Sequence, residues 1–116
     1  MDYKTARNFL IDQGTVLETQ RNPDAFLLRL KQGQPPIPGQ VTSILLALKI
    51  VFDALQEAPM IDRQLILALH SLAIDSLRQF EEGRRAGVAW PPLLKEDINR
   101  IATAVKNIFA DTWPPG

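Results

Sequence analysis

A fifteen-residue stretch in the middle of the chain, from Val41 to Leu55, is apolar on almost every side of a helical wheel. Its only charged residues, Lys49 and Asp53, have i,i+4 spacing and so lie on one narrow strip. A helix that is apolar nearly all round is buried by neighbours on several sides. The stretch is also shorter than the roughly 20 residues that a membrane span needs. It therefore predicts a buried central helix, at about residues 40–58, in a small soluble protein.

Capping residues and apolar spacing predict helices before this stretch. Asp2 or Thr5 can cap a first helix that runs to about Asp12, and Gly14 is expected to end it. Asn22 and Pro23 have the residue types that begin a second helix, which Gly33 ends. The segment between these two helices is too short for its periodicity to choose between a helical turn and a linker.

Two longer amphipathic patterns follow the central stretch. Asp62 is expected to cap a helix from Arg63 to about Glu82. Its predicted buried stripe consists of Leu65, Leu69, Leu72, Ala73, Leu77 and Phe80. The turn Trp90-Pro91-Pro92 opens the last helix, in which apolar residues from Leu94 to Phe109 recur every three or four positions.

The whole chain, residues 1–116, is expected to form one all-α domain, a bundle of four to five helices around the central one. Lys plus Arg and Asp plus Glu number 13 each, so the net charge of zero gives no long-range attraction to nucleic acid or anionic lipid. The chain has no cysteine, which excludes disulfides and Cys-based metal sites and fits the cytoplasm. The first residues do not resemble a signal peptide. We expect a cytoplasmic protein with no membrane contact.

His70 is the only histidine and the weak candidate for a ligand-binding residue. It could serve as a general base or pH-sensitive group in a cleft, or it could be a half-buried helix residue that bonds to backbone or water. The acidic residues do not form the Glu-x-x-His pairs of di-metal bundles, and no phosphate-binding loop or nucleophile elbow is present. No catalytic residue, metal site or cofactor is expected, and the sequence favours a non-enzymatic protein.

Basic and aromatic residues near the helix ends are candidates for contacts with partners. Arg78, Arg84 and Arg85 could bind nucleic acid, but Glu81 and Glu82 dilute this patch, so a solvated helix end is favoured and no nucleic acid is expected. Trp90 and Trp113 have the residue type of interface hot spots, although packing over the ends of the bundle is the favoured role of such residues beside helix boundaries. Together with Arg84 and Arg85 they are the predicted interaction residues.

The central stretch also bears on self-association. If the shorter helices cannot cover residues 41–55, a second copy must, and a symmetric dimer is the commonest arrangement. We therefore expect a protein interaction or assembly module that forms a homodimer or binds another protein. The alternatives are a small-molecule-binding bundle or minor enzyme with a pocket near His70, and nucleic-acid binding through the three arginines.

Three segments carry a resemblance to a known group. The opening from Asp2 to Leu10, the connector from Pro35 to Gly39 and the Trp90-Pro91-Pro92 turn together resemble small uncharacterised helical proteins of cyanobacteria. Some of those proteins carry the label dethiobiotin synthetase. That ligase family is an ATP-binding α/β family with a phosphate loop, and this sequence departs from it at every such position. The label therefore implies no activity for this chain.

Overall fold

The computed structural model describes residues 1–114, which form five helices and contain no strand. The helices are α1 (Tyr3–Thr19), α2 (Phe26–Lys31), α3 (Gln40–Ala54), α4 (Arg63–Arg85) and α5 (Leu94–Ala110). The prediction of an all-α bundle of four to five helices is confirmed.

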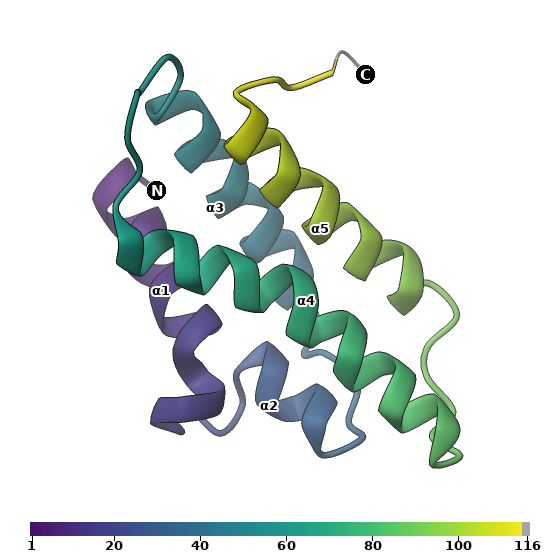
Figure 1. The fold of residues 1–116 in the computed structure, drawn as a ribbon. Coiled ribbons are helices and arrows are strands. Elements are labelled where there is room, and N and C mark those ends of the chain that lie inside the picture. Colours follow the sequence, from purple (N-terminus) through teal and green to yellow (C-terminus); the bar gives the residue numbers. More distant parts are fainter. Residues whose placement is uncertain (115–116) are drawn as a thin grey trace.

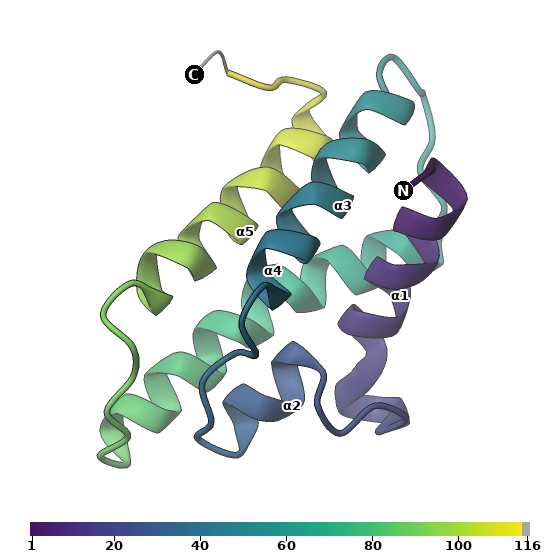
Figure 2. The ribbon, with the colours of Figure 1, turned by 180° about the vertical axis from the view of Figure 1, so that it is seen from behind.

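The helices lie in two layers. Helices α1, α3 and α5 form the rear layer, with α3 between the other two (Figure 2). Helix α4 crosses in front of this layer and packs against α1 and α5, while α2 closes the lower end beside α1 and α4 (Figure 1). The core lies between the layers, where 26 apolar residues are buried.

Helix α3 matches the predicted central helix, although it ends at Ala54, before the predicted limit near residue 58. Its buried residues are Ile44, Ala47, Leu48, Val51 and Phe52. The predicted solvated strip exists along Lys49 and Asp53, which pair at 2.9 Å, and it continues through Thr42 and Leu46. One copy of the chain therefore covers most of α3 by itself, so the need to cover this helix no longer argues for a second copy.

The predicted end of α1 at Gly14 is wrong, because the helix continues to Thr19. Gly14 lies where α1 crosses α4, and a Cβ at this position would be 2.6 Å from the Cα atom of Ala68. The missing side chain lets the two backbones approach closely, so this glycine serves helix packing instead of helix termination.

The predicted start of the second helix is also wrong by a few residues. Asn22 begins a turn in which its side-chain oxygen accepts a hydrogen bond from the Asp24 N–H at 3.2 Å, and α2 starts only at Phe26. Ala25, the residue before α2, makes no capping hydrogen bond through its side chain. Instead, the buried Gln13 of α1 accepts a hydrogen bond from the Phe26 N–H at 3.3 Å. A distant side chain thus takes the capping role that the sequence assigned to Asn22.

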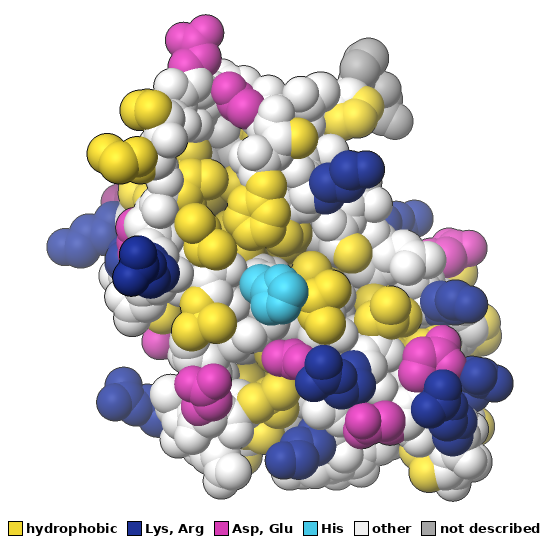
Figure 3. Space-filling view, in the orientation of Figure 1, with side chains coloured by type: hydrophobic (Ala, Val, Ile, Leu, Met, Phe, Trp, Pro, Cys, Tyr) yellow, Lys and Arg dark blue, Asp and Glu magenta, His cyan; other side chains and the backbone are white. Residues whose placement is uncertain are grey.

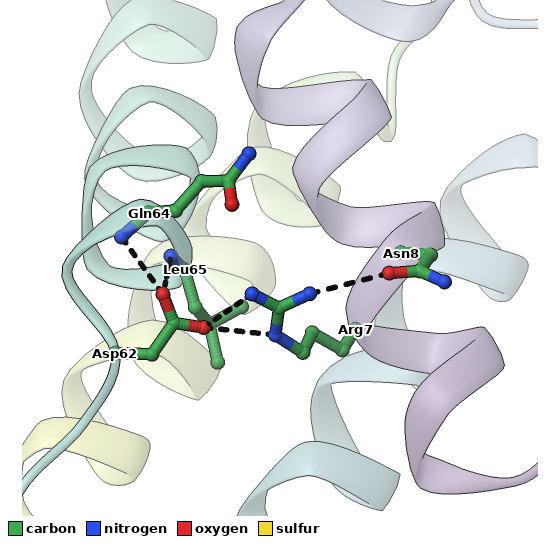
Figure 4. Close-up of polar contacts among 5 residues, drawn as sticks. All are labelled: Arg7, Asn8, Asp62, Gln64 and Leu65. Carbon is green, nitrogen blue, oxygen red and sulfur yellow. Dashed lines mark hydrogen bonds and ion pairs between the residues drawn. The ribbon is translucent and has the colours of Figure 1, made fainter.

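Asp62 caps α4 as predicted and also joins α4 to α1. Its Oδ1 accepts from the Gln64 N–H at 3.0 Å and the Leu65 N–H at 3.4 Å, and its Oδ2 accepts from Arg7 Nε at 2.8 Å (Figure 4). A second Arg7 nitrogen, Nη2, lies 2.6 Å from the same oxygen. The Arg7 hydrogen bond is the main cause that lowers the pKa of Asp62 below its usual value of 3.8.

This lowered pKa predicts an acid-sensitive contribution to stability. A carboxyl whose pKa is lower in the folded state stabilises the fold fully above its unfolded-state pKa of 3.8, and this stabilisation is lost as the pH falls through the folded-state pKa. Asp62→Asn keeps a capping side chain but cannot ionise. We expect wild type to be more stable than Asp62→Asn at pH 7, by about 1 kcal/mol for so exposed a pair. Thermal unfolding of both proteins should show this difference vanish at low pH; a difference that is constant with pH would contradict the assignment.

Candidate interaction surface

Helix α4 has apolar residues on two opposite faces. One face packs into the core through Leu65, Leu69, Leu72, Ser76 and Phe80. The opposite face turns to solvent and carries Leu67, His70, Ile74 and Leu77, which we call the outer face of α4. The three aliphatic side chains there are 50%, 43% and 40% exposed. The predicted burial of Leu77 is therefore wrong, because continued 3.6-residue spacing brings Ser76 to the core instead.

The outer face is part of a wider apolar area on the front of the molecule. In the space-filling view, hydrophobic side chains lie on several sides of the single histidine, over α4 and toward α5 (Figure 3). Ile66 of α4 and Phe109 of α5 are also exposed. The apolar pattern predicted for the last helix thus reaches solvent at Phe109. Exposed apolar patches rimmed by charged residues are typical of surfaces that bind other proteins.

His70 lies in the middle of the outer face and is exposed. It lines none of the three hollows of the surface at α3/α5, α1/α4 and the Pro36–Gly39 connector. The structure therefore places His70 on the solvent-exposed side of α4. Its role in ligand binding stays a prediction.

Trp90 packs within the molecule, over the end of the bundle. Its ring stacks on Phe80 with centroids 6.0 Å apart, and its Nε1 donates to the Phe80 carbonyl oxygen at 3.0 Å. Gly83 leaves room for it, since a Cβ there would lie 2.9 Å from Cε2 of the indole. This glycine lies inside α4, which extends to Arg85 instead of ending near Glu82 as predicted. The contacts of Trp90 therefore support packing over the end of the bundle.

Trp113 follows α5 and folds back onto α3. Its ring centroid is 4.9 Å from that of Phe52, and the ammonium of Lys49 lies 4.9 Å from the Trp113 ring. The ring borders a groove of about 520 Å³ between α3 and α5. Leu45, Ala104 and the polar row Asn99, Thr103 and Asn107 also line this groove. A small molecule could bind in this groove, which His70 does not line.

A second hollow of about 510 Å³ lies where α1 and α4 diverge, bordered by Ile11, Thr15, Gln64 and Leu67. Its rim thus includes one end of the outer face. A third, of about 260 Å³, lies under the connector between Pro36 and Gly39 and the start of α5.

The three arginines of the predicted basic patch lie near the C-terminal end of α4. Arg78 pairs with Asp75 at 3.3 Å, and Arg84 pairs with Glu81 at 3.0 Å. These pairs reduce the positive potential that a phosphate backbone would meet, as the sequence indicated. Arg85 is exposed at the helix end. As a set, these residues fit a solvated helix end better than a nucleic-acid surface.

Between Met1 and Pro114, no three His, Asp or Glu side chains gather closely enough to hold a metal ion. Within that range, no helix combines the length and the apolar character that a bilayer crossing requires.

Comparisons of the chain with models of protein families, with curated proteins and with solved structures found no match. The resemblance to cyanobacterial proteins therefore stays a prediction.

The outer face of α4 is the feature that sequence reasoning missed. The signal was available, because Leu67, Ile74 and Leu77 recur at the spacing of a second apolar stripe on the same helix. The assignment of Leu77 to the buried stripe hid this pattern.

Proposed function

We propose that this chain is a non-enzymatic protein interaction module, and that the outer face of α4 is its contact surface. The observation that supports the proposal is the row of half-exposed aliphatic side chains on a helix that already buries its opposite face. Burial of apolar surface contributes a favourable free energy of about 25 cal/mol for each Å², and these side chains do not gain it while they are in water. A partner that covers them recovers this free energy. The cytoplasm, where disulfides are rare, belongs to the same proposal for this chain without cysteine.

A matched pair of leucines tests this proposal. Leu67 on the outer face is 50% exposed and Leu46 on the rear of the molecule is 52% exposed. Replacing either with glutamate adds the same charge to an open helix position, so the effects on folding should be similar. We expect Leu67→Glu to weaken self-association about tenfold, the effect of about 1.4 kcal/mol. Leu46→Glu should leave it unchanged.

Sedimentation velocity over a concentration series measures this difference, with circular dichroism to verify that both variants are folded. Equal weakening of the two variants, at concentrations where the wild type associates, would contradict the proposal, because the contact would then not involve the outer face.

A further inference from the structure

We infer that the partner of this surface is a second copy of the chain, with the two α4 helices antiparallel about a twofold axis near the level of Leu72. The inference rests on the proposed function, since it assumes that the outer face of α4 is a contact surface. It adds the identity of the partner and the pairing of residues across the interface.

The spacing of the exposed residues is that of a coiled-coil seam. Starting at the first residue of α4, the seam contains Arg63, Leu67, His70, Ile74, Leu77 and Glu81, separated by four, three, four, three and four positions. This alternation is the a/d repeat of a heptad, which keeps one row of side chains directed at a partner helix. The fully buried Leu72 lies on the opposite side of the helix, so this row is free to meet another molecule.

The seam is also complementary to itself. Leu67 and Leu77 are each five residues from Leu72, in opposite directions, and His70 and Ile74 are each two residues from it. In an antiparallel pair centred on Leu72, each member of these couples therefore faces the other on the partner copy. A twofold interface requires this reciprocal arrangement.

The charges at the two ends of the seam select the same orientation. Arg63 and Glu81 are each nine residues from Leu72, so an antiparallel pair places each arginine opposite a glutamate of the other copy. A parallel pair would instead place arginine beside arginine and glutamate beside glutamate, which is unfavourable. Glu81 already accepts hydrogen bonds from Arg84, at 3.1 and 3.0 Å, so in the pair this carboxylate is shared between Arg84 and the Arg63 of the other copy.

The stability of α4 does not explain why residue 63 is an arginine. A cation in the first turn of a helix opposes the macrodipole, whose N-terminal end is positive. The side chain is exposed, and its nearest acidic neighbour in sequence, Asp62, pairs with Arg7 instead. A role in pairing with Glu81 of a second copy accounts for an arginine at a position where a helix by itself favours an acid.

Charge exchange tests the pairing. Arg63→Glu alone would place two glutamates together at both ends of the dimer, and Glu81→Arg alone would place two arginines together. We expect each variant to weaken self-association about tenfold, because two attractive pairs become repulsive. Mixing the two variants, or combining both changes in one chain, restores opposite charges at both ends and should restore wild-type association. Both substitutions suit the helix dipole, and the Arg84 pair that Glu81→Arg removes is a solvent-exposed one of small weight, so neither variant is expected to unfold.

Sedimentation equilibrium of wild type, the two single variants, their equimolar mixture and the double variant gives the dissociation constants at low salt. Recovery in the mixture supports the inference, since a loss caused by misfolding could not be recovered by mixing. No recovery, or a wild-type chain that stays monomeric, overturns it. If Leu67→Glu weakens association while the charge variants do not, the contact surface stands and only this pairing is wrong.

Discussion

Gly14→Ala is expected to destabilise the protein by about 3 kcal/mol, although alanine is the better helix former by about 1 kcal/mol. The added methyl group would overlap the backbone of Ala68, 2.6 Å from its Cα atom. Backbone atoms cannot rotate away as a side chain can, so α1 and α4 would have to move apart along their whole contact. For a domain of this size the melting temperature should fall by about 10 °C.

Gly83→Ala is the matched control for this prediction. Gly83 also lies within a helix, but its added Cβ would meet the indole ring of Trp90 instead of a backbone. The ring can shift only by weakening its stacking on Phe80 and its Nε1 hydrogen bond, so we expect a loss of about 2 kcal/mol, still below that of Gly14→Ala. Thermal unfolding followed by circular dichroism compares the two variants. A Gly14→Ala protein as stable as wild type would mean that the two helices do not pack as closely as described.

Trp90→Ala is expected to cost about 2.5 kcal/mol, somewhat below the usual range for a fully buried tryptophan. The change removes the stacking on Phe80 and opens the space above Gly83. Trp90→Phe keeps a ring but loses the hydrogen bond to the Phe80 carbonyl, so a loss of about 1 kcal/mol is expected.

Trp113→Ala provides the comparison, because Trp113 opens the second Trp-Pro-Pro sequence of the chain. Its ring contacts Phe52 and Lys49 from outside the bundle, so we expect a loss of about 1 kcal/mol. Urea unfolding of the three variants measures the differences. If Trp113→Ala were the more damaging change, Trp90 would not have the structural role assigned to it.

Local chemistry predicted much of this fold. Asp62 caps α4 because a carboxylate before a helix accepts the free N–H groups of its first turn, and this pattern is visible in four residues of sequence. The apolar spacing in residues 94–108 likewise predicts α5, whose buried residues follow that spacing. The central stretch was recognised as a buried helix because so few of its side chains are polar.

The errors arise where a distant part of the chain decides the local structure. Gly14 continues a helix because Ala68 lies against it, and the start of α2 depends on a side chain from Gln13. Neither partner is near in sequence, so short-range rules assign the wrong role to each residue. The candidate surface was missed for a related reason: whether Leu77 faces the core or solvent depends on which side of α4 the other helices cover.

The molar mass of the wild-type protein, followed by light scattering across a dilution series, tests the central claim most directly. The chain has a mass of 13.0 kDa. We predict that the measured mass approaches twice this value at high concentration and falls toward it on dilution, with Leu67→Glu dissociating at higher concentration than wild type. A constant mass of one chain at every concentration would contradict the pairing of two α4 helices.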